Sequence, residues 1–226
     1  MNMNKVFSGH QPNFIPYMGF FYKMFKSDIF VLDDDVKYSS KGLHNSNFII
    51  ENGERKKITV PVTHSSGELI NEIAICYDRK WDRKMLRTIE MNYRKCEFFE
   101  PVYDLVKKEI NKKPKRLADL NISLIIEIAK MLGISSKVVI ASQEVPTKLT
   151  NNERNVFQCK TLGCSKYYSG TGGKSYNDEE MYKENGIEIV YSDYVPVEIG
   201  EIKNLSVIDY LFRKGFVLPE RWKRNE

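Results

Sequence analysis

The sequence predicts an α/β protein with a Rossmann-like, mainly parallel sheet flanked by helices, and with a β-hairpin and a helical insertion in its middle. Three observations support this prediction. Short apolar runs alternate with amphipathic stretches at both ends of the chain, which is typical of strands connected by helices. The first strand, helix and strand fit within about 30 residues, the size of a βαβ unit with parallel strands. An Asn-Gly pair between two β-prone runs indicates the hairpin.

The elements expected in the N-terminal half follow from local patterns of apolar residues. Short runs bounded by turn residues predict strands, and the aromatic residues of "PYMGFFYKMFKSD" have helical spacing. Asn52-Gly53, between "NFIIE" and "ERKKITVPV", is the strongest short hairpin signal and predicts where the chain turns. The expected elements are a strand at about 5–8, a helix at about 16–26, a strand at about 28–33, the hairpin, and a loop at about 63–72.

Helices dominate the sequence that follows the hairpin. "YDRKWDRKMLRTIEMNYRKC" and "PVYDLVKKEINKK" read as two helices separated near Pro101, and "LADLNISLIIEIAKMLG" as a third, which Gly133 closes. Thr150-x-x-Glu153 is a capping box and predicts the start of another helix, which ends at Gly163. The remaining expected elements are strands in "SKVVIAS", "SKYYS" and "IEIVYSDY", a glycine-rich loop in "SGTGGKSY", and helices in "DEEMYKENG" and "LSVIDYLFRKG".

Length and composition indicate one domain. A chain of 226 residues with 42% hydrophobic and 29% charged residues is ordinary for a globular protein. We therefore expect a single α/β domain over residues 1–226, with a hairpin and helical subregion at about 45–132. The sequence has neither an apolar run of membrane-spanning length nor the pattern of a signal peptide. We expect a cytoplasmic protein without membrane insertion.

Charge and cysteine content argue against nucleic-acid binding and against a metal site. The net charge is +5, but the basic clusters at 107–116 and 221–224 lack interleaved aromatic residues, so no DNA binding is expected. Cys159 and Cys164 form a C-x4-C pair that no second pair or nearby histidine completes as a zinc set. We expect reduced, mostly buried thiols and no metal.

Polar residues follow the first predicted strand, at the end where open α/β sheets bind ligands. In "GHQPNFIP" the residues Pro12 and Pro16 restrict the backbone, so the loop is stiff. His10 titrates near neutrality and is the candidate general base. Its alternative role is to hold the loop by donating to a backbone carbonyl. Gln11 and Asn13 are candidate substrate-binding residues, because their amide groups both donate and accept.

Candidate site residues also follow two further predicted strands. Asp33 and Asp34 are candidate catalytic residues that can orient a histidine or bind an acceptor, but adjacent strand residues point to opposite faces, so one of them is expected to face the site. The alternative is simple solvation of a strand end. The glycine-rich loop can cradle a phosphate with Lys174 as counter-charge, although it lacks P-loop spacing and a plain turn is the alternative. The substrate-binding candidates at these two ends are Tyr38, Ser169, Gly170, Gly172, Gly173, Lys174 and Tyr176.

Several of these motifs also carry a family resemblance. "GHQPNFIPYMGFFYKMFKSDIFVLDDDVKY", with "ITVPV", "LADLNISLIIEIAKMLGI", "CKTLGCSKYYSGTGGKSY" and "NLSVIDYLFRKG", resembles the WbqC-like family of bacterial surface-polysaccharide gene clusters. Where that family tends to read "NRN", this chain reads Asn45-Ser46-Asn47. The resemblance implies a role in O-antigen and lipopolysaccharide biosynthesis, and it adds Asn45 and Asn47 to the substrate-binding candidates.

The resemblance further implies an acyl- or aminoacyltransferase, with glycine transferase as one form, acting on an amino sugar that is expected to be nucleotide-linked. Amide formation needs a base near pKa 7 and donors for the oxyanion. The sequence implies no particular cofactor, and the activated donor stays open between a carrier-protein thioester, an aminoacyl-tRNA and an ATP-derived adenylate. An acyl-carrier protein is therefore one candidate partner. The alternative is a non-catalytic protein that binds a sugar or nucleotide sugar, for which the 13 tyrosines are equally suited.

Overall fold

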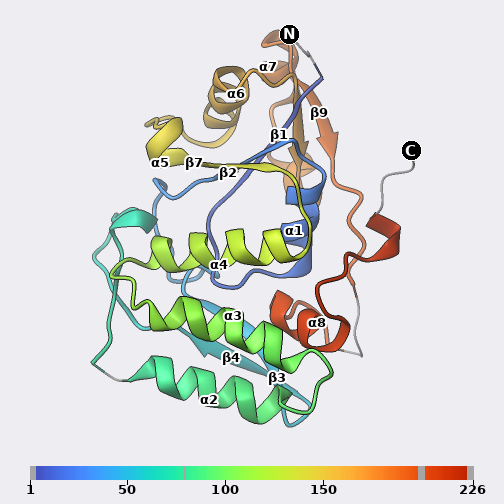
Figure 1. Cartoon of the computed structure of the whole chain (residues 1–226). Coiled ribbons are helices and arrows are strands. Elements are labelled where there is room, and N and C mark those ends of the chain that lie inside the picture. Colours follow the sequence, from blue (N-terminus) through green and yellow to red (C-terminus); the bar gives the residue numbers. More distant parts are fainter. Residues whose placement is uncertain (1–3, 79, 198–201, 223–226) are drawn as a thin grey trace. The chain divides into compact units, whose positions relative to one another are not determined.

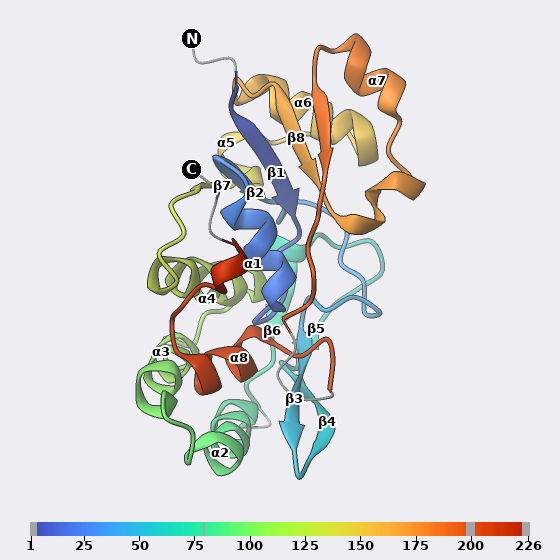
Figure 2. The ribbon, with the colours of Figure 1, turned by 90° about the vertical axis from the view of Figure 1, so that its right-hand side faces the viewer.

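The computed structural model describes residues 4–78, 80–197 and 202–222, and this part of the chain folds into two compact units (Figure 1 and Figure 2). Unit 1 consists of Met1–Gln11, Gly19–Asp35 and Ile134–Val195. Unit 2 consists of Pro12–Met18, Val36–Gly133 and Pro196–Glu226. The subregion predicted at about 45–132 lies within unit 2.

Unit 1 is built on a five-stranded sheet with the strand order β7-β2-β1-β8-β9. The strands are β1 (Val6–His10), β2 (Ile29–Leu32), β7 (Lys137–Ile140), β8 (Lys166–Ser169) and β9 (Glu188–Tyr191). Every neighbouring pair is parallel, and helix α1 (Met18–Phe25) connects β1 to its neighbour β2. The predicted βαβ unit and the predicted α/β fold class are confirmed.

The core of unit 1 joins the sheet to the helices α6 (Asn151–Thr161) and α7 (Glu179–Glu184). Phe7 and Val31 of the sheet pack in one cluster with Cys159 of α6 and Tyr182 of α7, and Figure 2 shows these two helices beside β8 and β9. Strand β2 lies inside the sheet and is buried along its whole length, and burial on both faces explains its continuous apolar run. Cys159 is one of the predicted buried thiols.

Two local features of unit 1 differ from the prediction, although α6 begins after Thr150 as expected. Thr150 does precede the first residue of α6, but its side chain makes no capping hydrogen bond, since Asn151 follows it with a φ of 52° and the chain enters the helix by another path. A short helix, α5 (Ala141–Glu144), also follows β7 directly and was not predicted. Its start is fixed by a distant residue, because the Asp34 carboxylate accepts from the backbone N–H of Ser142 at 2.9 Å.

Unit 2 contains the predicted hairpin. Strands β3 (Ser46–Glu51) and β4 (Glu54–Thr59) pair antiparallel. The turn residues Asn52 and Gly53 have φ values of 53° and 81°, as a type I′ turn requires. The loop predicted at about 63–72 lies between two short strands that pair antiparallel, β5 (Val62–Thr63) and β6 (Ala74–Ile75), and it contains a 3-10 turn, η1 (Ile70–Glu72). Strands of two residues are too short to produce an alternating pattern, so the sequence does not reveal them.

Unit 2 contains the four predicted helices, but Pro101, expected to separate the first two, lies in the first turn of the second. The helices are α2 (Trp81–Tyr93), α3 (Phe99–Asn111), α4 (Leu117–Met131) and α8 (Val207–Lys214), with a final 3-10 turn, η3 (Glu220–Trp222). Figure 1 shows α2, α3 and α4 stacked one above another, and the Phe212 ring of α8 stacks on Tyr93 of α2 with centroids 4.4 Å apart. Within the described residues, no helix combines the length and the apolar character needed to cross a membrane.

The proline-flanked segment that enters unit 2 adopts a strained backbone. Ile15 is fully buried with a φ of 40°, a region that β-branched residues rarely occupy. Its carbonyl accepts from Asn47 Nδ2 at 2.7 Å and from Ser206 Oγ at 2.8 Å, and Asn47 Nδ2 also donates to the Phe14 carbonyl at 3.1 Å. Such strain persists where the surrounding contacts over-determine the conformation. These hydrogen bonds therefore fix the loop between its two prolines.

Candidate functional site

The order in which the strands of the unit 1 sheet follow one another reverses between β1 and β8. Strands β2 and β7 follow on one side of β1, whereas β9 follows on the far side of β8. Open α/β sheets bind ligands outside the carboxyl ends of their strands at such a switch point. The ladder between β1 and β8 ends at Phe7, while the ladder between β1 and β2 continues to His10. The last residues of β1 therefore extend past their pairing with β8.

His10 is the last residue of β1. Its Nδ1 lies 2.9 Å from the carbonyl oxygen of Gln11. A carbonyl only accepts, so this contact selects the tautomer that is protonated at Nδ1 and carries its lone pair on Nε2. The ring also packs edge-on against Phe20 of α1, with centroids 5.0 Å apart. The contacts orient the imidazole, as either a general base or a loop-holding histidine requires.

Asp33 follows β2 and points toward the end of β1. Its side chain is buried, and Oδ1 accepts from Arg154 Nε at 2.9 Å and from Gln158 Nε2 at 2.7 Å, both on α6. Burial raises the pKa of the Asp33 carboxyl, and the two α6 side chains act against this rise. A Cβ on Gly9 would lie 3.0 Å from Asp33 Oδ2. A glycine at this position therefore lets the carboxylate approach the β1 backbone closely.

The Asp34 side chain binds Ser142 and not α6. Its Oδ1 accepts from the Ser142 backbone N–H at 2.9 Å, and its Oδ2 accepts from the Ser142 hydroxyl at 2.6 Å, at the start of α5. Of the two candidate aspartates, Asp33 approaches β1 and Asp34 holds the first turn of α5.

The glycine-rich segment after β8 forms a 3-10 turn, η2 (Thr171–Ser175), which agrees with the plain turn given as the alternative to a phosphate-cradling loop. The Gly170 carbonyl accepts from Gly173 N at 2.9 Å, and the Gly173 carbonyl accepts from Tyr176 N at 3.1 Å. These N–H groups are used within the turn and are not directed at a ligand. The side chain of Lys174 is exposed, and its Nζ lies 5.4 Å from the ring centroid of Tyr191 on the edge strand β9.

Gly173 provides a test of how tightly this turn packs. A Cβ at Gly173 would lie 2.0 Å from the hydroxyl oxygen of buried Ser169, whereas a Cβ at Gly172 would meet nothing within 4 Å. We expect Gly173→Ala to lower the free energy of unfolding by about 1–3 kcal/mol, the usual cost of overpacking. The matched control Gly172→Ala should change it by less than about 0.5 kcal/mol. Chemical denaturation of both variants measures the difference, and equal losses would contradict the packing described.

Four predicted site residues belong to unit 2, namely Asn13, Tyr38, Asn45 and Asn47. The amides of Asn45 and Asn47 donate to backbone carbonyls of unit 2. The Tyr38 ring lies between two histidine rings, with centroid distances of 5.5 and 4.9 Å. Asn13 is buried, and its Oδ1 has no hydrogen-bond partner in the described part of the chain. These contacts of Tyr38, Asn45 and Asn47 thus stay within unit 2.

Three residues at the switch point were not predicted: Lys23, Arg154 and Gln158. Lys23 Nζ, from α1, donates to the Gly9 carbonyl at 2.6 Å. Burial lowers the pKa of the Lys23 ammonium to about 8, against the opposing effect of the nearby Asp33 carboxylate. One signal could have revealed Lys23, because it is a single charge inside the apolar stretch "GFFYKMF". The two α6 residues carry no such signal.

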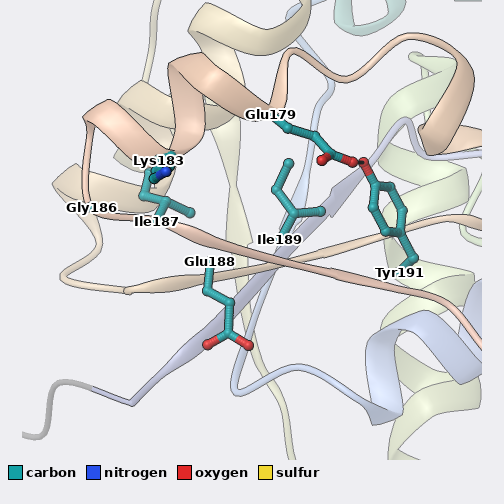
Figure 3. Close-up of a pocket in the computed structure, with 7 residues that line it drawn as sticks. All are labelled: Glu179, Lys183, Gly186, Ile187, Glu188, Ile189 and Tyr191. Carbon is teal, nitrogen blue, oxygen red and sulfur yellow. Dashed lines mark hydrogen bonds between the residues drawn. The ribbon is translucent and has the colours of Figure 1, made fainter.

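A separate groove of about 470 Å³ runs along the edge strand β9. Figure 3 shows the residues that line it, which are Glu179, Lys183, Gly186, Ile187, Glu188, Ile189 and Tyr191. The Tyr191 hydroxyl donates to Glu179 Oε1 at 2.6 Å and closes one end of the groove. None of the predicted site residues lines this groove, so it is distinct from the switch point.

Comparisons with known proteins agree with the resemblance seen in the sequence. The model of the WbqC-like protein family matches residues 11–218. An uncharacterized protein of Mycobacterium tuberculosis, Rv1507c, is 28% identical over 219 residues, which are 93% of this chain and 94% of that protein. The family match thus includes α1, the end of β2 and α6, whereas β1 with His10 directly precedes it. The chain belongs to the WbqC-like protein family.

Proposed function

We propose that this protein is an acyl- or aminoacyltransferase that forms an amide on an amino sugar during assembly of bacterial surface polysaccharide. The observation that supports the proposal most directly is the group at the switch point of unit 1. There His10 ends β1, Asp33 follows the adjacent β2, and Lys23 reaches the Gly9 carbonyl from α1. A base, a carboxylate and a cation at neighbouring strand ends are suited to reactions of charged, hydroxylated substrates.

His10 would act as the general base of this reaction. As the substrate amine attacks the activated carbonyl carbon, His10 Nε2 takes the amine proton, and a C–N bond forms. The tetrahedral intermediate then collapses, the bond between the carbonyl carbon and the donor breaks, and the donor leaves as the carrier thiol, the free tRNA or AMP; His10 returns its proton to the leaving sulfur or oxygen or, with AMP, to solvent. The Gln11 amide, next along the chain, is the candidate donor to the oxyanion. Asp33 would bind the acceptor rather than orient His10, since its Oδ1 is held by α6.

The proposed acceptor is a nucleotide-linked amino sugar, and glycyl is one candidate acyl group. The donor would be a carrier-protein thioester, an aminoacyl-tRNA or an ATP-derived adenylate, so an acyl-carrier protein is a proposed partner. These compounds are made in the cytoplasm, where we place the reaction. The likeness to WbqC-like proteins, noted for surface-polysaccharide gene clusters, supports this substrate class.

A second candidate function, non-catalytic sugar binding, is favoured by one observation. Tyr176 is 63% exposed beside η2, and exposed aromatic rings are suited to stacking on sugars. Under this alternative the His10 contact with the Gln11 carbonyl would serve only to hold the loop.

The proposal is tested by incubating the purified chain with nucleotide-linked amino sugars that carry a free amine and with each of three glycyl donors. The donors are a glycyl carrier-protein thioester, glycyl-tRNA, and glycine with ATP, and mass spectrometry detects the amide product. We expect product with one donor. Tight binding of the sugar nucleotide without product for any donor or acceptor would favour the binding protein, and neither binding nor product would reject both candidates.

A further inference from the structure

Beyond Phe7 the backbone of β1 is no longer paired with β8. The His10 carbonyl accepts from the Asp33 backbone N–H at 3.0 Å and so points toward β2. Successive carbonyls of an extended strand point to opposite sides, because the backbone alternates with a period of two residues. The Gly9 carbonyl therefore points toward the β8 side, beyond Phe7, where the ladder with β8 ends. Lys23 Nζ lies there, 2.6 Å from the Gly9 oxygen.

The Lys23 ammonium has hydrogen-bonding capacity left at this position. An ammonium carries three N–H donors, and one of them is directed at Gly9. No ion pair in the described part of the chain includes Lys23, and the Asp33 carboxylate near it is bound to Arg154, which also pairs with Asp35. The nearby Asp33 carboxylate acts against the lowering of the Lys23 pKa but forms no ion pair with the ammonium among the described residues, so a directly bound anion would compensate the desolvation of Lys23 further. An anion at this point would therefore be stabilised.

Lys174, which was predicted as the counter-charge for a phosphate, does not lie at the end of β1. Lys174 is exposed, and its ammonium sits over the Tyr191 ring of the edge strand β9. Lys23 is thus the lysine that reaches the end of β1 from within unit 1.

We propose that Lys23 binds an anionic group of the ligand, a phosphoryl or carboxylate oxygen, at the switch point between β1 and β8. The proposal deepens the proposed function and rests on it for the identity of the ligand, since a nucleotide-linked sugar, an aminoacyl-tRNA and an adenylate all carry phosphoryl groups. An ammonium recognises phosphate as a point charge and suits this role.

Direct observation of the Lys23 side chain tests the proposal without any turnover. Lysine labelled with ¹³C and ¹⁵N gives side-chain resonances by NMR, and the Lys23→Arg variant assigns the Lys23 signal. Burial lowers the Lys23 pKa to about 8, so this signal should titrate near pH 8. Inorganic pyrophosphate should shift the signal and raise its titration midpoint, because a bound anion favours the charged form. Acetate is the parallel probe and distinguishes a carboxylate site from a phosphoryl site.

Variants test the same contact by affinity. Lys23→Met should weaken pyrophosphate binding by about 10- to 100-fold, as expected for the loss of a hydrogen bond between two charged groups. Lys174→Met and Lys26→Met are matched controls and should change affinity less than about twofold, since Lys26 lies over the Tyr22 ring, with Nζ 5.3 Å from its centroid. Thermal unfolding verifies that each variant is folded, and Lys23→Arg, which keeps the charge, should restore most of the affinity.

Two results would overturn the proposal. One is a Lys23 signal that responds to neither pyrophosphate nor acetate over the whole titration. The other is loss of anion affinity in Lys174→Met but not in Lys23→Met. Because the readouts need no reaction, an intact anion response without amide formation would reject the transferase and leave this site standing.

Discussion

Replacement of His10 by asparagine is expected to lower the rate of amide formation by about 10²–10⁴-fold, the usual contribution of a general base. Asparagine keeps similar size and a donor for the Gln11 carbonyl, but it has no group that titrates near neutrality. The fold should persist, because His10 lies at the end of a strand and loses mainly its edge-on contact with Phe20, worth about 0.5–1.5 kcal/mol. Product formation and thermal unfolding of the variant measure the two effects separately.

The outcome for His10 separates a catalytic role from a structural or a binding role. His64→Asn is a suitable control, because His64 is an exposed histidine of unit 2 and should leave turnover unchanged. Full turnover of His10→Asn would dismiss His10 as the base, and collapse of its thermal stability would make His10 a structural residue. Weakened sugar binding in the variant, with no reaction in the parent protein, would favour the binding protein.

Replacement of Arg154 by leucine is expected to lower the free energy of unfolding by about 3–5 kcal/mol, the cost of breaking a buried ion pair. Arg154 is 5% exposed, and its guanidinium binds both Asp33 and Asp35. The substitution leaves the Asp33 carboxylate buried, with Gln158 as its remaining side-chain hydrogen-bond donor among the described residues. Chemical denaturation of the variant and the parent protein measures the loss.

The loss caused by Arg154→Leu should also depend on pH. Burial raises the folded-state pKa of Asp33, and removing Arg154 removes the largest influence that acts against this rise. A group with a raised folded-state pKa favours folding at low pH and loses that contribution as the pH rises through the folded-state pKa. The stability lost by the variant should therefore be largest at neutral pH and shrink as the pH falls toward the ordinary aspartate pKa.

Arg87→Leu, at an exposed position of α2, is the control and should lower the free energy of unfolding by less than about 0.5 kcal/mol. A loss of that size for Arg154→Leu, constant with pH, would show that the ion pair contributes no net stability.

Several features of this fold could be predicted because their causes are local. Asn52-Gly53 tolerates the positive φ values of a tight hairpin turn, so the pair itself specifies where β3 ends and β4 begins. The continuous apolar run of β2 indicated a strand, and the structure buries it along its whole length. The short span from β1 through α1 to β2 then required a parallel pair. This pairing brings the His10 and Asp33 positions to neighbouring strand ends.

Other features depended on residues that are distant in the sequence. The start of α5 is held by Asp34, which is 108 positions away from Ser142, and Arg154 and Gln158 reach Asp33 across 121 and 125 positions. A side chain that pairs over such distances shows no periodicity that would reveal its partner.

The sequence by itself determined the α/β class, the order of most elements, the hairpin turn and the strand ends at which polar residues gather, because turn propensity and apolar periodicity act within a few residues. Only the tertiary structure decided which polar side chains meet at those ends. It directed Asp33 to α6, Asp34 to α5, Lys174 to the Tyr191 ring and Lys23 to the Gly9 carbonyl. For Asp33, Asp34 and Lys23 the choice follows from desolvation, since a buried charge or carbonyl takes the partner that packing brings within hydrogen-bond distance.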